Sequence, residues 1–372
     1  MFREKKMQFN KQLNDIKVYE GGKPIEEVVR EYGILPESIV KLASNENPFG
    51  TSPKVIEAIR QNAPTVHMYP DDSMHDLKSA LARKYDVGIH NLIIGAGSDQ
   101  IIAFAVGAKA NRYKRLLTAK TTFAMYEIYA KQFGSKVFKT PSHQHKIDEF
   151  YRLYQKRRDE IGIIFLCMPN NPLGESLDAD AVFDFIAKID DNTMVVVDGA
   201  YQDFATAKDP KKRIDPKQLI ERFPNTLYLG TFSKSYGLGG MRVGYGIGSE
   251  EIMQALYKMR PPFNVTSLSL KAATAALEDE AFVQMGIENN FKEMQKYEVF
   301  AKENKIDFID SYTNFITLLF DEKRNSTQIA QMLLKKGIII RDLKSYGLNA
   351  IRVTIGKPEQ NQRFFEEISP LL

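Results

Sequence analysis

The sequence predicts an α/β protein, with a mostly parallel sheet covered by helices on both faces and a smaller α+β domain beside it. Segments with apolar residues at helical spacing, such as Asp178–Ile189, alternate with short runs through the middle of the chain. These runs are apolar throughout, which indicates strands buried on both faces, and their alternation with helices is typical of a parallel sheet. The runs are Leu92–Gly95, Arg115–Ala119, Ile161–Met168, Met194–Asp198, Leu227–Gly230 and Val243–Ile247.

The last third of the chain has a different pattern. A long helical stretch over Ser267–Asn304 is followed by short strands over 314–320, 337–341 and 351–355, around a helix near 327–336. Pro261 and Pro262 mark the junction, because paired prolines cannot continue a helix. We therefore expect a large domain over 48–262 and a small domain built from 1–47 and 263–372.

Length, charge and cysteine content limit the class of protein. The 372 residues leave room for two domains of about 150 residues or more. The 51 Lys and Arg against 47 Asp and Glu give a net charge of +4, too small to indicate a nucleic-acid partner. The one cysteine, Cys167, fits a reducing compartment and is expected to be an inert core thiol. No apolar run approaches the ~20 residues that span a bilayer, so we expect a cytoplasmic protein with no membrane partner.

No metal site is expected. His143 and His145 form a His-x-His pair, but no third ligand accompanies them, so a surface loop is the preferred interpretation.

The strongest local feature surrounds Lys234. This lysine follows an apolar run and precedes a glycine-rich stretch that ends at Arg242. The hydroxyls of Thr231 and Ser233, together with Arg242, suit a phosphate, which leaves Lys234 as an amine nucleophile toward a carbonyl. A surface lysine in a flexible loop is the alternative.

Three further motifs follow other apolar runs. Asp198 ends one run, where its carboxylate can pair with a protonated pyridine nitrogen, although an aspartate there can equally cap a helix or bind Mg²⁺. Asn171 lies in a turn after another run and offers an amide donor. Gly97-Ser98-Asp99 follows a third run at a predicted helix start, a position that binds phosphate. Gln100 stands where a dinucleotide-binding motif has its third glycine, so the sequence gives only weak support for a dinucleotide such as NAD.

Together these motifs resemble the pyridoxal 5′-phosphate (PLP) aminotransferases of fold type I. Asn171, Asp198, Tyr201, Lys234 and Arg242 come in the order and at the spacing of that family. The resemblance extends from Asn45-Glu-Asn-Pro near the start to Arg352-Val-Thr-Ile-Gly near the end, so it spans nearly the whole chain. Within the family the sequence is most similar to histidinol-phosphate aminotransferases. That similarity depends on Tyr19 with Gly21-Gly-Lys-Pro-Ile-Glu-Glu, Leu42-Ala-Ser-Asn-Glu-Asn-Pro, Tyr69-Pro-Asp and Gly337-Ile-Ile-Ile-Arg-Asp.

The resemblance implies the type I PLP-dependent transferase fold and PLP as the cofactor. It implies transamination of L-histidinol phosphate with 2-oxoglutarate, giving imidazole-acetol phosphate and L-glutamate, a step of histidine biosynthesis. It also implies a homodimer with shared active sites. An aromatic-amino-acid aminotransferase and a PLP-dependent decarboxylase of a phosphorylated amino acid would keep the same motifs. A binding protein that has lost turnover is a further alternative, which an intact Lys234 and Asp198 disfavour.

The resemblance also assigns roles to single residues. Lys234, Asp198 and Tyr201 are the catalytic residues: Lys234 holds the cofactor covalently and moves a proton, and Asp198 pairs with the ring nitrogen. Asn171 and Tyr201 hydrogen-bond the ring oxygen, and Phe123 stacks on the ring. The residues assigned to the cofactor phosphate are Ser98, Asp99, Thr231, Ser233, Arg242 and, from the other subunit, Tyr69. Those assigned to the substrate are Tyr19, Asn45, Arg341 and Arg352, of which Arg352 clamps the substrate anion.

Three positions depart from the commonest family pattern. Leu173 stands where a threonine is usual, Gly199 where a glutamate is usual, and Phe123 where a tyrosine is frequent. None of these changes removes an obligatory chemical group, so they bear on the choice of substrate.

Overall fold

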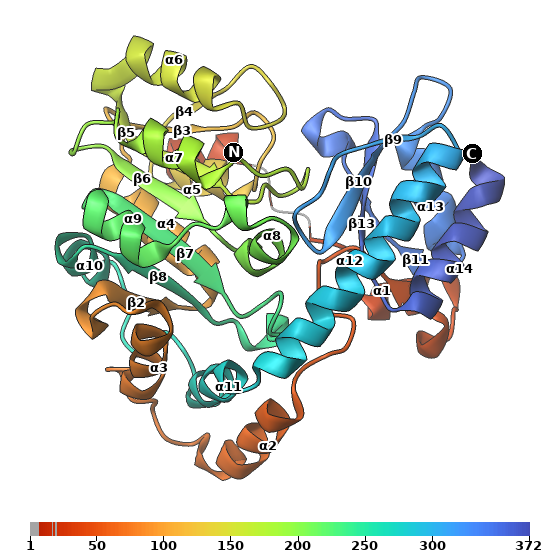
Figure 1. The fold of residues 1–372 in the computed structure, drawn as a ribbon, viewed down its shortest axis with the longest axis horizontal. Coiled ribbons are helices and arrows are strands. Elements are labelled where there is room, and N and C mark those ends of the chain that lie inside the picture. Colours follow the sequence, from red (N-terminus) through yellow and green to blue (C-terminus); the bar gives the residue numbers. More distant parts are fainter. Residues whose placement is uncertain (1–6, 17, 19–20) are drawn as a thin grey trace, which may run out of the picture.

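A computed structural model describes residues 7–16, 18 and 21–372 (Figure 1). Its larger part contains a seven-stranded sheet with the order β2-β8-β7-β6-β5-β3-β4. β8 pairs antiparallel with both of its neighbours, and the other pairs are parallel, which confirms the predicted fold class. The strands are β2 (Leu92–Gly95), β3 (Arg115–Thr118), β4 (Val137–Lys139), β5 (Ile161–Cys167), β6 (Met194–Asp198), β7 (Thr226–Thr231) and β8 (Gly244–Gly248).

Helices cover both faces of this sheet. Ile163 and Phe165 of β5 pack toward α4 (Gly97–Lys109), α5 (Met125–Gln132) and α10 (Glu250–Tyr257). Ile164 and Leu166 of the same strand pack toward the opposite face. Each large apolar side chain buried in this way contributes about 1.5–3 kcal/mol. The helices of the opposite face are α2 (Pro53–Asn62), α3 (His75–Tyr85), α6 (Ile147–Arg157), α7 (Ala179–Ile186), α8 (Gln202–Lys208), α9 (Pro216–Arg222) and α11 (Ser267–Leu277).

The smaller part is built on an antiparallel sheet. Its order is β12 (Arg341–Asp342), β13 (Ala350–Thr354), β10 (Phe315–Leu319) and β9 (Asp307–Phe308). The helices α12 (Glu280–Glu303), α13 (Ser326–Lys335) and α14 (Pro358–Ile368) pack on it, and α12 runs diagonally past both parts in Figure 1. Near the chain start, α1 (Ile25–Tyr32) precedes β1 (Val40–Lys41), which pairs with β11 (Ile338–Ile339). Both chain ends therefore contribute to this part.

The predicted helix over Ser267–Asn304 is wrong in one respect, because the structure divides it into α11 and α12. Asp279 begins α12: its carboxylate accepts the backbone N–H of Phe282 and also a hydrogen bond from the hydroxyl of Ser52. Helix α11 packs on α2 and α3 and shares the apolar core of the large sheet. The boundary at residue 262 stays a prediction, and this packing favours a later junction, near Asp279.

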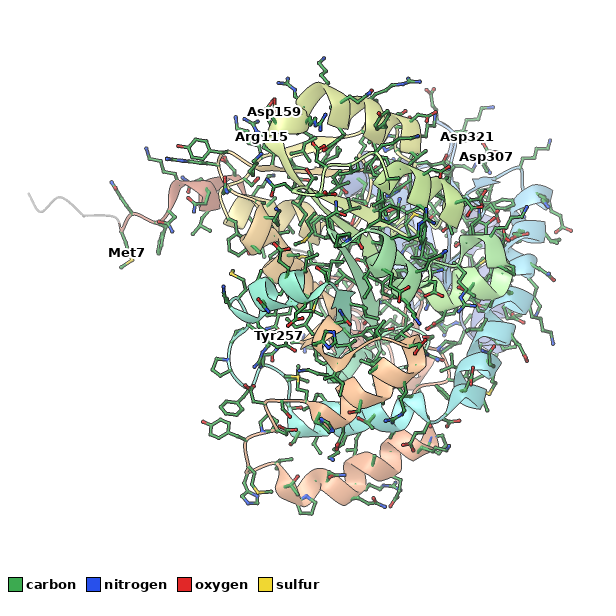
Figure 2. All side chains as sticks on the ribbon, turned by 60° about the vertical axis from the view of Figure 1, so that its left-hand side comes forward. Met7, Arg115, Asp159, Tyr257, Asp307 and Asp321 are labelled. Carbon is green, nitrogen blue, oxygen red and sulfur yellow. The ribbon has the colours of Figure 1, made fainter. Side chains whose placement is uncertain are left out.

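The described part of the N-terminal segment lies against the large sheet's helices. The short 3₁₀ helix Lys11–Asp15 contacts α5, and Met7 extends away from the body in Figure 2. Tyr19, predicted to bind substrate, lies outside the described residues. No helix in the described ranges is both long and apolar enough to cross a bilayer.

Candidate active site

The carboxyl ends of β5, β6 and β7 border a cavity of about 140 Å³. Gly97, Cys167 and Ala200 contribute to its wall. The rest of the wall consists of residues that were predicted to bind the cofactor: Ser98, Asp99, Phe123, Asn171, Asp198, Tyr201, Thr231, Ser233, Lys234 and Arg242. The fold therefore brings together groups that lie as far as 144 residues apart in the sequence, from Ser98 to Arg242.

Lys234 lies three residues beyond the end of β7 and lines the cavity. Its Nζ donates a hydrogen bond to the carbonyl of Ser44 at 3.2 Å and lies 5.7 Å from the centre of the Tyr201 ring. Burial, and after it the positive charge of Arg352, lowers the pKa of Lys234 to about 8. With this pKa, roughly a tenth of the amine is neutral, and nucleophilic, at pH 7, which is far more than for an ordinary lysine.

Asp198 is the last residue of β6 and is buried. Its Oδ2 accepts the hydroxyl of Tyr126 at 2.7 Å, and its Oδ1 accepts the backbone N–H of Ala200 at 3.1 Å. Burial raises the pKa of this carboxyl, and the hydrogen bond from Tyr126 opposes that effect. A cationic group bound in the cavity could form an ion pair with the carboxylate of Asp198.

Asn171 is held by a residue of the smaller sheet. The guanidinium of Arg352, on β13, donates to Asn171 Oδ1 through Nη1 and to the carbonyl of Ala43 through Nη2 at 2.6 Å. Arg352 is buried and also lies over the Phe315 ring, 5.0 Å from its centre. Because Oδ1 of Asn171 accepts from Arg352, Nδ2 is the group that can donate toward the cavity.

Tyr201 is positioned by Asn45. The Nδ2 of Asn45 donates to the Tyr201 hydroxyl at 2.8 Å, so the hydroxyl can donate its own proton into the cavity. Asn45 has a positive φ of 57° and is fixed in turn by Thr354 and Asn314 of the smaller part. In this structure Asn45 therefore contacts Tyr201; its predicted contact with substrate stays a prediction.

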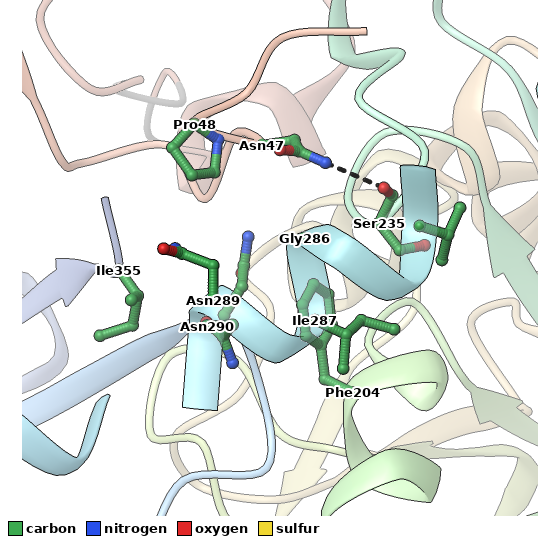
Figure 3. Close-up of a pocket in the computed structure, with 11 residues that line it drawn as sticks. Asn47, Pro48, Phe204, Ser235, Gly286, Ile287, Asn289, Asn290 and Ile355 are labelled. Atoms are coloured by element: carbon green, nitrogen blue, oxygen red, sulfur yellow. Dashed lines mark hydrogen bonds between the residues drawn. The ribbon is translucent and has the colours of Figure 1, made fainter. Parts of the chain in front are cut away.

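A small second cavity of about 10 Å³ is lined in part by Ser235, the residue after Lys234 (Figure 3). Asn47 crosses its edge and donates to the carbonyl of Ser235, the neighbour of Lys234, at 3.0 Å. Residues 43–47 thus contact Arg352, Lys234, Tyr201 and Ser235 in succession. This segment joins the two sheets at the site.

The far end of the cavity can hold an anion. Helix α4 begins at Gly97, whose φ is +76° and whose missing side chain leaves room for Arg242: a Cβ there would meet Arg242 Nη2 at 2.8 Å. The hydroxyl of Thr231 donates to that of Ser233 at 3.1 Å, and both line the same end. Helix-start amides, hydroxyls and a guanidinium are the donors that bind phosphate in proteins.

Asp99 shares this end of the cavity. It accepts the hydroxyl of Tyr129 at 2.8 Å, and burial raises the pKa of its carboxyl. The amides at the start of α4 and the guanidinium of Arg242, rather than this carboxyl, are therefore the donors for a phosphate.

Of the predicted residues that the structure describes, four are not among those that line the cavity: Asn45 and Arg352, which hold Tyr201 and Asn171, and Tyr69 and Arg341. Tyr69 lies on the surface, 82% exposed, and stacks on Phe263 with ring centres 4.7 Å apart. Arg341 on β12 is the cross-strand partner of Arg352, and its Nη1 donates to the carbonyl of Gly21 at 3.3 Å. The two arginines are thus neighbours on one sheet.

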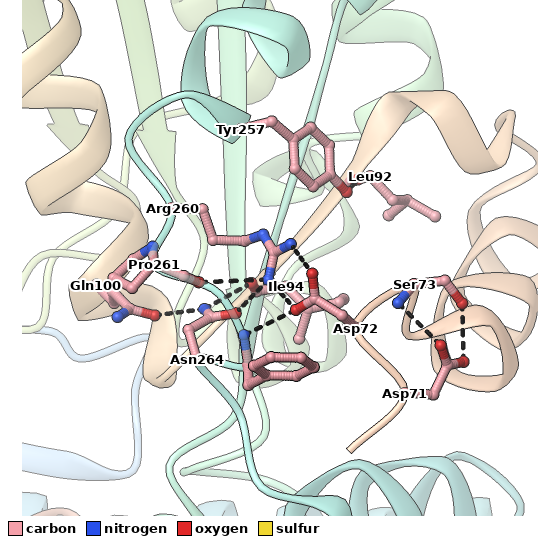
Figure 4. Close-up of polar contacts among 11 residues, drawn as sticks. Asp71, Asp72, Ser73, Leu92, Ile94, Gln100, Tyr257, Arg260, Pro261 and Asn264 are labelled. Carbon is pink, nitrogen blue, oxygen red and sulfur yellow. Dashed lines mark hydrogen bonds and ion pairs between the residues drawn. The ribbon is translucent and has the colours of Figure 1, made fainter. Parts of the chain in front are cut away.

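The loop that carries Tyr69 is tied to helix α4 of the same chain (Figure 4). Arg260 binds both carboxylate oxygens of Asp72 at 2.7 Å, and Asp72 accepts the N–H of Phe263 at 2.8 Å. Asn264 accepts from Arg260 at 3.0 Å and donates to Gln100 of α4 at 2.6 Å. This network holds the Tyr69–Phe263 stack at the surface.

The three departures from the family pattern have local explanations. Leu173 packs with Leu343 and Ala350, so it adds an apolar contact between the Asn171 loop and the smaller sheet. A Cβ at Gly199 would meet the Tyr228 hydroxyl at 2.5 Å, so Tyr228 fills the space of a side chain there. Phe123 lines the cavity, as expected of a stacking ring.

One other expectation needs correction, for His145, and the expectation of a buried core thiol at Cys167 is confirmed with one addition. His145 is buried and does not lie on a surface loop. Its backbone N–H and the side-chain amide of Asn170 both donate to Glu175. Cys167 is buried, and burial raises the pKa of its thiol to about 12, but it lines the cavity rather than lying only in the core. Across residues 7–16, 18 and 21–372 no three His, Cys, Asp or Glu side chains gather as metal ligands would.

Sequence reasoning missed the two tyrosines of α5 that contact the site carboxylates. Tyr126 donates to Asp198 and Tyr129 to Asp99. The available signal was their spacing of three residues, which puts them on one face of a helix directly after Phe123.

Comparison with known proteins identifies the family. The profile of aminotransferase class I and II matches residues 37–368. A histidinol-phosphate aminotransferase of Wolinella succinogenes is 60% identical over 360 residues, which is 97% of this chain and 98% of that protein. The same enzyme of Campylobacter lari is 61% identical over 363 residues, 98% of this chain and 99% of that protein.

Solved structures agree in fold. Histidinol-phosphate aminotransferase from Sinorhizobium meliloti, in complex with PLP, has a TM-score of 0.87 at 24% identity and covers 98% of this chain and 97% of that one. L-threonine-O-3-phosphate decarboxylase from Porphyromonas gingivalis has a TM-score of 0.77 at 22% identity, over 89% and 98% of the two chains. At these identities the likeness is one of fold.

The lowered pKa of Lys234 predicts how its reactivity depends on pH. Since only the neutral amine reacts, modification of Lys234 by an amine-directed reagent should have its midpoint near pH 8, and not at the ordinary value of 10.5. Because the charge of Arg352 lowers this pKa, Arg352→Gln should move the midpoint upward. Arg341→Gln, on the adjacent strand, is the control and should leave it in place.

The measurement is made on protein from which any cofactor bound to Lys234 has been removed: the pH profile of the modification rate, followed by mass spectrometry of the peptide that carries Lys234. A midpoint at the ordinary lysine value in the unchanged protein would contradict the prediction.

Proposed function

Because the chain belongs to the aminotransferase class I and II family, we propose that it transfers the amino group of L-histidinol phosphate to 2-oxoglutarate. The products are imidazole-acetol phosphate and L-glutamate. The observation that carries the proposal is the single cavity in which Lys234, Asp198 and a phosphate-binding end face one another. Relatives about 60% identical over nearly their full length carry the name of this enzyme.

The cavity has the donor set that PLP requires. Lys234 offers an amine for the aldehyde, Asp198 a carboxylate for the ring nitrogen, and Asn171 and Tyr201 hydrogen-bond donors for the ring oxygen. Phe123 offers an aromatic face to the ring. The residues proposed to hold the phosphate are Ser98, Thr231, Ser233 and Arg242, with Asp99 contributing its backbone N–H and not its carboxyl. When bound, PLP supplies an aldehyde and a ring that withdraws electrons from the substrate.

The chain's own residues then have separate tasks. Lys234, with its lowered pKa, is the base that takes the proton from the substrate Cα and delivers it to the carbon of the cofactor's former aldehyde group, so that the substrate carbon can become the carbonyl carbon of the product. Asp198 keeps the ring nitrogen protonated, since an opposite charge in a buried site favours the charged form. Asn171 and Tyr201, held by Arg352 and Asn45, fix the ring's orientation.

Arg352 is proposed to bind the anionic group of both substrates. Histidinol phosphate has a phosphate and no carboxylate, whereas glutamate has two carboxylates, and a guanidinium binds either group in a bidentate manner. Arg341, its cross-strand partner, supplies a second positive charge at the same sheet edge. Tyr19 and Asn45 are proposed to complete this end.

We further propose that the enzyme is a cytoplasmic homodimer in which Tyr69 of one subunit reaches the cofactor phosphate of the other. The exposure of Tyr69, and its separation from the residues lining its own cavity, support that arrangement.

The first test of the function is cofactor binding and substrate choice. The purified protein should have a visible absorption band from lysine-bound PLP, and Lys234→Ala should lack it. Its kcat/KM for histidinol phosphate should exceed that for phenylalanine and for O-phosphothreonine by about 100-fold, the effect of losing one charge-assisted contact or misplacing it. A preference for phenylalanine, or release of CO₂ from O-phosphothreonine, would favour one of the rival activities.

The second test concerns Arg352. Arg352→Ala should raise KM about tenfold or more for both histidinol phosphate and glutamate, measured separately in the two half-reactions. Arg352→Lys keeps the charge but not the two-pronged geometry and should recover only part of the loss. An effect on one half-reaction alone would show that the two substrates do not share Arg352.

The third test concerns Tyr69. In a shared site, Tyr69→Ala damages the partner's site while Lys234→Ala inactivates its own subunit. Unfolding and refolding a mixture of the two variants should then restore activity, because one site of each hybrid dimer has both Lys234 and Tyr69 intact. Mixtures with no more activity than the sum of the two separate variants would exclude sharing through Tyr69.

A further inference from the structure

We propose that Tyr126 is a positioning residue for Asp198. The hydroxyl of Tyr126 keeps the carboxylate of Asp198 ionised and oriented toward the ring nitrogen of the cofactor. This inference rests on the proposed function, since it assigns Tyr126 a task toward the bound cofactor. Tyr126 itself is not among the residues that line the cavity. Tyr126 lies in the first turn of α5 and is fully buried.

The contact between the two side chains is direct. Tyr126 Oη donates to Asp198 Oδ2 at 2.7 Å, and the Ala200 N–H donates to Oδ1 at 3.1 Å. A carboxylate has about four acceptor sites, so these two donors leave acceptor positions for a third. Asp198 lines the cavity, so a protonated ring nitrogen there can be that third donor. The hydroxyl thus sets which way the carboxylate presents its remaining positions.

Neighbouring rings fix the position of the tyrosine. Its ring stacks on Phe165 of β5, with centres 4.3 Å apart and 19° between planes, and meets Phe123 edge-on at 5.6 Å and 82°. Phe123 is the residue proposed to stack on the cofactor ring. The segment from Phe123 to Tyr126 therefore connects the contact on the face of that ring with the contact at its nitrogen.

The surroundings of Asp198 make this donor important. Burial raises the pKa of Asp198, and the hydrogen bond from Tyr126 is the largest effect in the opposite direction, ahead of the Ala200 N–H. Burial and Asp198 raise the pKa of Tyr126 well above its ordinary value, so the phenol keeps the proton that it donates. The other titratable groups facing Asp198 are Asp99 on α4, Cys167 on β5, Tyr201 before α8 and Tyr228 on β7, with Lys234 across the cavity.

The test is Tyr126→Phe, which removes one oxygen atom and keeps the ring. The equilibrium Kd for PLP, measured by titrating apoprotein at several pH values, should rise about tenfold, equal to about 1.4 kcal/mol. The affinity of the unchanged protein for PLP should fall on the acid side as Asp198 becomes protonated. Without the hydroxyl the pKa of Asp198 is higher, so in the variant this fall should begin at a higher pH. A purely structural defect would weaken binding equally at every pH.

Two comparisons separate positioning from general damage. Tyr154→Phe is the matched control, because Tyr154 is also a buried tyrosine that donates to a carboxylate, Asp190 Oδ2 at 2.9 Å, but away from the cavity. Tyr154→Phe should leave unchanged both the Kd for PLP and the pH at which the affinity begins to fall on the acid side. In an Asp198→Asn background, Tyr126→Phe should have little further effect on the Kd. An equal loss in that background would overturn the inference.

A second change at the same position acts in the opposite direction. Incorporation of 3-fluorotyrosine at residue 126 gives a more acidic hydroxyl, which is a stronger hydrogen-bond donor. The fall in PLP affinity on the acid side should then begin at a lower pH. No change in that pH, or a rise, would overturn the inference. This measurement decides the question if Tyr126→Phe does not fold. Failure of the unchanged protein to bind PLP would overturn the proposed function as well. Normal PLP binding that Tyr126 variants leave untouched would overturn the present inference alone.

Discussion

The parallel pairing of β5, β6 and β7 is the constraint on which the site depends. In register, Cys167 lies beside Asp198 and Asp198 beside Leu229, so the three strands end at the same edge of the sheet. The groups that follow, the Asn171 loop, Asp198 itself and the Lys234 loop, must then converge. Apolar packing on both faces fixes this register, because a shift of one residue would turn each strand's side chains to the wrong face. The energy of the core is thus what holds polar groups within reach of one another.

A second constraint is the return of both chain ends to this edge. Residues 43–47 contribute one backbone carbonyl and two amide side chains to groups of the large part. A second carbonyl, that of Ala43, accepts from Arg352 of the smaller sheet, and Thr354 and Asn314 hold the same segment from that side. The buried Arg352 spans the junction. Since buried polar groups without partners are costly, separating the two parts would leave several donors and acceptors unpaired at once. The geometry of the site therefore depends on the docking of the smaller sheet against the large part.

Much of the fold and the site was predictable from the sequence, for physical reasons that also set the limits. Strands buried on both faces have continuous apolar runs, so β2 and β6 were predicted with their bounds, whereas the short, half-exposed β4 gave no such signal. The residues gathered at the cavity follow strand ends, where position in sequence implies position in space. Contacts such as Asn45 to Tyr201, or Tyr126 to Asp198, depend on side chains from distant elements and were not predictable from local pattern. The division between α11 and α12 depends on a single capping aspartate, Asp279, within a continuous helical pattern.

The hydroxyl of Tyr228 on β7 lies beside Gly199, the residue directly after the neighbouring strand β6, and so links two positions nearly thirty residues apart in sequence. Any side chain entering at position 199 needs the space that this phenol occupies, and removal of the phenol first would leave an empty space in the core. Either single replacement is therefore costly, whereas the exchanged pair can pack as well as the original. Lineages of this family are expected to differ at both positions together or at neither. The residue after Asp198 is then constrained by the packing of the core beneath the cavity.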